Sequence, residues 1–153
     1  MDYAPENTIY FYAHTDDFSE FSNFAPYGVA FDGLWWRTVE DYFQAMKFHG
    51  EACHERIRAC GKPKDAKALG MTRKTPLRQD WEDVKDAIML DAVRCKFRTH
   101  ELPRQLLLST GNACIAENAP LDAYWGIGSD GLGLNRLGEI LMLVREELQI
   151  EQS

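Results

Sequence analysis

The sequence predicts a helix-rich α+β protein, mainly α-helical with a small antiparallel sheet, folded as a single domain over residues 1–153. The chain has 153 residues, of which 45% are apolar, and this is enough to bury a core. Apolar residues recur at three- and four-residue spacing over most of the assigned length. Short β-branched and aromatic segments near the N-terminus supply the strands.

The strand signals are confined to four short segments. Residues 8–12 are β-branched and aromatic. Two apolar segments, 29–31 and 34–36, flank Asp32-Gly33, a dipeptide typical of a two-residue hairpin turn. Residues 113–116 form the fourth predicted strand.

The helices are predicted from their end signals. Thr38 and Asp41 form a capping box that opens a helix running to His49, where Gly50 stops it. A second box, at Asp80 and Asp83, opens another helix. Further helices are predicted at 51–60, at 64–69 between Pro63 and Gly70, around 103–108, and at the C-terminus, where one apolar stripe comprises Leu137, Ile140, Leu141, Val144 and Leu148.

Charge and composition favour a small-molecule substrate. The net charge of −7 disfavours duplex nucleic acid or an anionic membrane as the main partner. No apolar run approaches the ~20 residues of a membrane helix, and the N-terminus lacks a secretory pattern, so we expect a cytoplasmic protein. The cysteines form no C-x-x-C pair and the histidines no ligand spacing, so we expect no disulfide, metal or cofactor. No signal sets the oligomeric state.

A glycine-rich segment precedes the last helix. Residues 125–136 hold four of the eleven glycines within eight positions, among them Gly126, Gly131 and Gly133. Glycines admit close ligand approach, and a helix start offers free N–H groups, so phosphate is the natural guest. Asn135 can cap the helix, and Arg136 in its first turn suits the helix dipole only if an anion is bound. The alternative is an acidic surface loop before a well-capped helix.

A second candidate cluster lies on the helix after Thr38. Glu40, Phe43, Gln44 and Lys47 fall on one face, with Glu40 and Lys47 about 10 Å apart along the axis. They are either a solvated pair or two groups addressing one ligand. Neutralising a lysine of ordinary pKa at pH 7 costs about 4.6 kcal/mol. If Glu40 touches Lys47, the lysine is an electrostatic anchor rather than a nucleophile.

Two loop segments complete the candidates. Asp122 and Trp125 precede the glycine loop and pair a carboxylate with a flat ring, suited to a sugar and a base, or else are a turn acid and a core tryptophan. Ser22-Asn23-Phe24 offers polar atoms beside an aromatic surface, or is ordinary turn material.

Several of these segments resemble those of a known protein family. Over about residues 9 to 149 the chain resembles the YbiA/NADAR family, and the matching segments are Phe11-Tyr12, 18–24, 38–48, 66–70, Asp80-Trp81, Lys96-Phe97, 122–126 and 131–138. Asp41 departs from the family pattern, in which a histidine more often follows the glutamate.

The resemblance implies an N-glycosidase that cleaves the bond between a phosphorylated ribose and a nitrogenous base, without a cofactor. It places Glu40, Asp122 and Trp125 at functional positions and Lys47 where a lysine attacks the sugar. The implied substrates are early riboflavin-biosynthesis intermediates. The alternatives are removal of ADP-ribose from guanine, including guanine in nucleic acid, and a module that binds ADP-ribose without cleaving it. We expect one hollow to hold the sugar between acidic side chains and its phosphate at the last helix.

Overall fold

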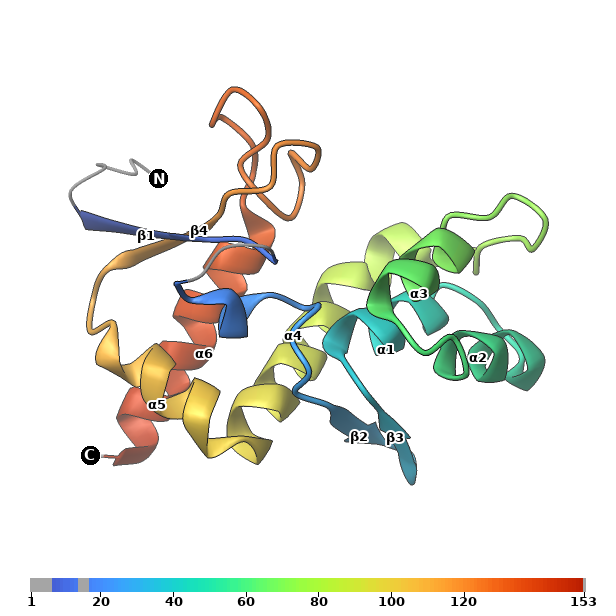
Figure 1. The fold of residues 1–153 in the computed structure, drawn as a ribbon, viewed down its shortest axis with the longest axis horizontal. Coiled ribbons are helices and arrows are strands. Elements are labelled where there is room, and N and C mark those ends of the chain that lie inside the picture. The colour runs from blue at the N-terminus through green and yellow to red at the C-terminus, as the bar shows by residue number, and fades with distance from the viewer. Residues whose placement is uncertain (1–6, 14–16, 153) are drawn as a thin grey trace. The chain divides into compact units, whose positions relative to one another are not determined.

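The structure, a computed structural model, describes residues 7–13 and 17–152. Their contacts divide the chain into two units. The first comprises the residues up to 22 together with those from 100 onwards, and the second comprises residues 23–99. The first unit is built around the C-terminal helix and the second around the helix that begins at Val39 (Figure 1).

The first unit packs helix α6 (Arg136–Gln152) against strand β4 (Cys114–Glu117). Strand β1 (Thr8–Phe11) pairs with β4 in parallel, with Thr8 opposite Cys114. Helix α5 (Glu101–Ser109) contacts both α6 and the 3₁₀ turn η2 (Ser19–Phe21). The predicted apolar stripe of the last helix is buried in full, which confirms that prediction: its members are Leu137, Ile140, Leu141, Val144 and Leu148.

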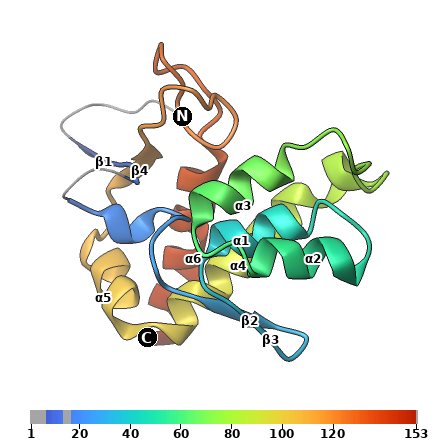
Figure 2. The ribbon, with the colours of Figure 1, turned by 45° about the vertical axis from the view of Figure 1, so that its right-hand side comes forward.

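The second unit surrounds helix α1 (Val39–Ala45), whose seven residues are all buried. Helices α2 (Glu51–Arg58), α3 (Pro63–Gly70) and α4 (Trp81–Thr99) all pack against α1, and Figure 2 shows α1 between them. Strands β2 (Val29–Phe31) and β3 (Leu34–Trp36) form an antiparallel hairpin. A helix buried on every side holds its polar side chains inside the unit rather than in water.

The predicted hairpin is confirmed. Asp32 and Gly33 have φ angles of 52° and 79°, the left-handed values that the tight turn requires of both central residues. The helix-rich α+β class is confirmed as well. The pairing of β1 with β4 corrects the expectation of an antiparallel sheet alone, because these strands are parallel and their pairing depends on contacts far apart in the chain.

The helix predicted to reach His49 is shorter. Helix α1 ends at Ala45, and the N–H groups of Lys47 and Phe48 bond to carbonyls three residues back, as in a 3₁₀ turn. Gly50, with a φ of 111°, precedes α2 instead of closing α1. Lys47 therefore lies in the turn after the helix, and the predicted placement of Lys47 on the helix face with Glu40 is wrong.

The capping boxes formed only in part. Thr38 Oγ1 accepts from the Asp41 N–H at 3.0 Å, as predicted. The Asp41 carboxylate instead accepts from Arg37 at 2.6 Å, and the Asp80 carboxylate accepts from Arg78 at 2.6 Å. A charged guanidinium is a stronger partner for a carboxylate than a neutral amide is, so the arginine wins where both are within reach. Within the described ranges, no helix is both long enough and apolar enough to span a membrane.

Candidate active site

A buried carboxyl group lies near the start of α1. Glu40 is 6% exposed, and its N–H donates to the Asn23 carbonyl at 3.1 Å. One turn further on, Gln44 Nε2 donates to Glu40 Oε1 at 2.7 Å. Burial raises the pKa of Glu40, against the opposing effects of the Gln44 bond and the positive charges of Lys67 and Lys47. Glu40 therefore holds its proton at a higher pH than an exposed glutamate does.

The Lys47 amine lies in the same unit. Its Nζ is partly buried and donates to the Gly70 carbonyl at 3.4 Å. Burial lowers the pKa of Lys47, while the charge of Glu40 opposes that shift. Although both residues are described, the structure contains no ion pair between them. Within the described residues, the Lys47 amine therefore bonds to the Gly70 carbonyl rather than to the Glu40 carboxyl group.

Two buried oxygen atoms near Glu40 have no hydrogen-bond partner within the described residues. They are Gln44 Oε1 and Asn23 Oδ1, on side chains that are 4% and 9% exposed. The Asn23 amide nitrogen donates to Met89 Sδ at 3.4 Å, a weak acceptor. Buried acceptors are normally satisfied, so these two oxygens are suited to hydroxyl or water donors.

Helix α3 adds a positive charge that the sequence analysis missed. The Lys67 ammonium lies 5.9 Å from the centroid of the Phe24 ring, and its charge lowers the pKa of both Glu40 and Lys47. The segment 66–70 matched the family, but nothing in its local pattern singled out this lysine. Of the loop candidates, Phe24 thus joins the second unit's cluster, whereas Ser22 is buried in the first unit, with its N–H bonded to Ser19.

Asp122 in the first unit forms a turn around one carboxylate oxygen. Its Oδ1 accepts from the N–H groups of Tyr124 and Trp125 at 3.0 and 2.9 Å. No hydrogen bond to the second oxygen occurs within the described residues. The Trp125 ring stacks edge-on against Tyr124, with 4.9 Å between centroids. Asp122 is therefore both the turn acid of one interpretation and a carboxylate with an oxygen open to a substrate.

The glycine loop folds onto itself. A Cβ at Gly126 would lie 2.7 Å from the Glu117 carbonyl oxygen, and one at Gly133 would lie 2.6 Å from the Gly126 carbonyl oxygen. Every backbone N–H from residue 131 to residue 137 donates to an oxygen of the loop or its flanks. These glycines therefore serve internal packing, and the expected cradle of free amides for phosphate is not formed there. Gly131 alone is exposed, with a φ of 76°.

Asn135 and Arg136 have different surroundings. Asn135 is fully buried, and its side chain bonds the backbone of β4, donating to the Ile115 carbonyl and accepting from the Glu117 N–H. Asn135 thus joins α6 to the strand, a role that the capping interpretation missed. Arg136 pairs with Glu139 at 3.0 Å, and its side chain is 43% exposed, so it can reach an anion in water.

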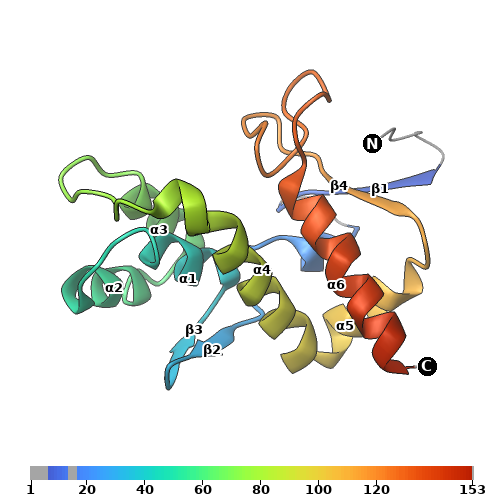
Figure 3. The ribbon, with the colours of Figure 1, turned by 180° about the vertical axis from the view of Figure 1, so that it is seen from behind.

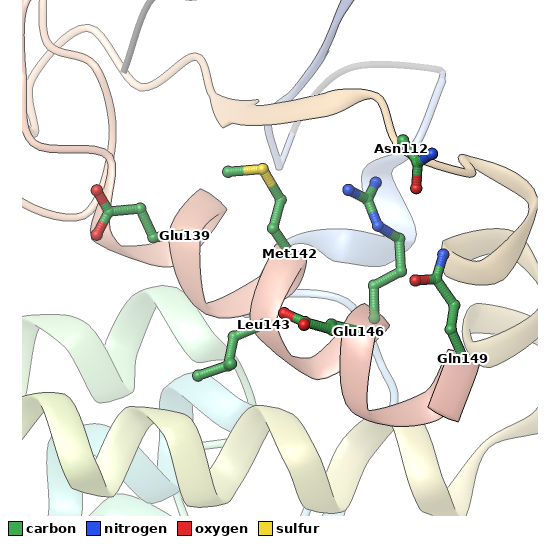
Figure 4. A pocket seen from close by; sticks show the side chains of 7 residues that line it. Asn112, Glu139, Met142, Leu143, Glu146 and Gln149 are labelled. Carbon is green, nitrogen blue, oxygen red and sulfur yellow. The ribbon is translucent and has the colours of Figure 1, made fainter. Parts of the chain in front are cut away.

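A pocket of about 510 Å³ lies in the first unit, along α6 (Figure 4). Two of its polar side chains bond to the chain itself: Arg145 donates to Thr110 and Ala113, and Gln149 donates to Gly111. The pocket is lined by no residue of the predicted site. Within residues 7–13 and 17–152, no three His, Cys, Asp or Glu side chains gather as metal ligands would.

The structure thus brings together five predicted residues in the second unit, namely Asn23, Phe24, Glu40, Gln44 and Lys47. The remaining predicted residues belong to the first unit. Seen from behind in Figure 3, α6 runs down from the loop that carries most of them.

Comparison with known proteins identifies the relatives. Residues 10–149 match the NADAR domain. The chain is 46% identical over 147 residues to N-glycosidase YbiA of Shigella boydii, covering 96% of this chain and 92% of that protein. It is 38% identical over 157 residues to the chloroplastic riboflavin biosynthesis protein PYRR of Zea mays, covering 93% of this chain and 25% of that protein. The NMR structure of Escherichia coli YbiA superposes with a TM-score of 0.87 at 46% identity, covering 95% of this chain and 87% of that one.

Proposed function

We propose, from the premise that this chain belongs to the NADAR family and is an N-glycosyl hydrolase, that its substrates are phosphoribosylated heterocycles of the kind formed early in riboflavin synthesis. One observation supports this assignment above the others. Glu40 and Lys47 lie in one unit, and burial shifts the pKa of each toward the neutral form. A neutral acid and a neutral amine are the two groups needed to exchange a base on a sugar for an enzyme nitrogen.

The proposed reaction begins with the open form of the sugar, in which C1 is joined to the nitrogen of the base as a protonated imine. The Lys47 amine adds to C1, and the bond between C1 and the base nitrogen then breaks. Glu40 gives its proton to the departing nitrogen and takes up one of the two protons that the Lys47 nitrogen carries in the adduct, so the base leaves as a neutral amine and Lys47 is left as a protonated imine. Water adds to the Lys47 imine that remains, releasing the sugar phosphate as an aldehyde and restoring the free amine. The one proton left over when water hydrolyses that imine passes to solvent.

The remaining proposed roles fall on five further residues. The open oxygen of Asp122 stabilises positive charge as it develops on the sugar, and Trp125 stacks on the base. Arg136 is the proposed phosphate ligand, because its exposed guanidinium is suited to a bidentate contact. Asn23 and Gln44 present their unpartnered oxygens to sugar hydroxyls.

The test is a two-substrate assay. The protein is incubated with a ribosylamino-pyrimidine phosphate and, separately, with ADP-ribosylated guanosine, and the release of ribose phosphate or ADP-ribose is followed. We expect turnover of the pyrimidine compound to be the faster by at least tenfold in kcat/KM. Faster turnover of ADP-ribosylated guanosine would overturn the substrate assignment while leaving the hydrolase class intact.

A further inference from the structure

We propose that Gly70, the last residue of α3, is a positioning residue that holds the Gln44 amide against the Glu40 carboxyl group. This inference rests on the proposed function, because it gives Glu40 a role in turnover. Gly70 lies against the Gln44 side chain, and its carbonyl accepts from Lys47 Nζ.

The space beside Gly70 is filled by the Gln44 side chain. The residue is buried, and a Cβ built there would overlap Gln44 Oε1 and lie 2.7 Å from its Cδ. The φ of Gly70 is outside the left-handed region, so the backbone itself would accept alanine. The three atoms nearest to that Cβ all belong to the Gln44 side chain, which accounts for glycine at this position.

Within the described residues, a single hydrogen bond holds the Gln44 amide. Its nitrogen donates to Glu40 Oε1 at 2.7 Å, and its oxygen has no partner within the described residues. One hydrogen bond leaves an amide free to rotate unless packing blocks it. Helix α3 packs along α1, and the Gly70 backbone lies so close to the Gln44 amide that a Cβ there would overlap Oε1. Close packing at this glycine thus fixes the donor that orients Glu40.

Gly70 also contacts the second reactive group, the Lys47 amine. The Gly70 carbonyl accepts from Lys47 Nζ at 3.4 Å. The end of α3 therefore touches both Lys47, directly, and Glu40, through Gln44. A methyl group at this position would displace Gln44 toward or away from Glu40 and leave the carbonyl group in place.

The experiment is a double-mutant cycle on kcat with the variants G70A, Q44A and G70A/Q44A. We expect G70A to lower kcat by about 10- to 100-fold, as small misplacements of a reacting group do. In the Q44A background, where the obstructing amide is gone, we expect G70A to change kcat by less than about twofold. A68G is the matched control, because it loosens α3 at an exposed position without adding an atom near Gln44.

A second measurement separates positioning from folding. The Gln44 bond favours the ionised form and so lowers the pKa of Glu40. G70A and Q44A should therefore each move the alkaline limb of the pH–rate profile to higher pH, whereas A68G should not. Should G70A fail to fold, folding of G70A/Q44A would support the steric argument, and failure of both would overturn it.

Additive effects of G70A and Q44A on kcat, or an unchanged pH profile in G70A, would overturn the inference. That result is distinct from failure of the proposed function, which would appear as full activity of E40Q. Loss of activity in E40Q together with normal kcat in G70A would reject the role of Gly70 alone.

Discussion

Glu40 is an acid whose pKa the fold raises. Its folded pKa is raised by burial, so above the unfolded pKa of 4.5 the unfolded state releases its proton first and stability falls as pH rises to the folded pKa. Below 4.5 both states are protonated and this penalty vanishes. Glutamine has nearly the same shape, remains neutral, and still accepts from Gln44.

We therefore expect E40Q to be more stable than the parent protein at pH 8, with the difference disappearing below pH 4, in urea titrations at each pH. Its turnover should fall by about 100-fold or more, since an amide cannot supply the proton to the departing base. Equal stability of the two proteins at both pH values would show that Glu40 is not held neutral. A Glu20→Gln change, at a carboxyl group outside this cluster, is the control.

Lys47 is a base whose pKa the fold lowers. K47R retains a positive charge but cannot form a neutral nucleophile, so we expect kcat to drop by more than about 1,000-fold, as loss of a covalent nucleophile does elsewhere. With borohydride and substrate, mass spectrometry should show a sugar-phosphate adduct on Lys47 in the parent protein and none in K47R. Retained turnover in K47R would make the residue an electrostatic anchor.

The pH dependence of the Lys47 reaction follows from the same burial. Because the pKa of Lys47 is lowered, its neutral fraction should rise at a pH below the 10.5 of an ordinary lysine. The acidic limb of adduct formation should therefore have its midpoint below 10.5. A midpoint at or above that value would contradict burial of the amine.

At the scale of elements, Asn135 connects the start of α6 to β4. Its φ of 52° favours asparagine or glycine, and its two side-chain bonds satisfy the Ile115 carbonyl and the Glu117 N–H. N135G keeps the backbone conformation and loses the bonds, whereas N135A loses both. We expect N135G to lower the free energy of unfolding by about 3 kcal/mol, and N135A by about 1 kcal/mol more.

Chemical denaturation of the two variants and the parent protein measures these differences. The order of the variants is the sharper result, because it isolates the backbone conformation from the hydrogen bonds. A stability of N135A equal to that of N135G would mean that the left-handed conformation costs alanine nothing here. Asn7→Ala, at an exposed asparagine, controls for the change of residue type.

The element boundaries show where local signals suffice. The Asp32-Gly33 turn, Pro63 in the first turn of α3 and the apolar stripe of α6 were all predicted, because each depends on residues within a few positions. The end of α1 was not, since no glycine or proline lies at Ala45 and the chain leaves the helix four residues before Gly50. The β1–β4 pairing was missed because a strand segment does not encode its partner.

At the scale of the whole molecule, the residues that the family resemblance implies are functional are divided between the two units. Glu40 and Lys47 belong to the second unit and Asp122 to the first. The D122N variant keeps the oxygen atom that accepts from the N–H groups of Tyr124 and Trp125, and it removes the negative charge of the carboxylate. We expect turnover to fall by about 100-fold with binding of ribose 5-phosphate retained in calorimetry.

Asp130 offers the control for that variant, since its carboxylate accepts from the Leu132 N–H in the same loop. D130N should keep both turnover and binding. Loss of ribose 5-phosphate binding in D122N would make Asp122 a binding residue rather than a catalytic one. Unchanged turnover in D122N would leave it as a turn acid alone.

The sequence by itself determined the helix-rich class, the family, and the residue types of the site, because periodicity, turn chemistry and motifs are local properties of the chain. Only the tertiary structure decided which of those residues are chemically altered. Glu40 is buried on a helix that packs against three others, and Lys47 bonds to the carbonyl at the end of α3. The N–H groups of the glycine loop donate to oxygens of the loop or its flanks. Burial and long-range packing depend on neighbours distant in sequence, and these neighbours set the pKa of a side chain.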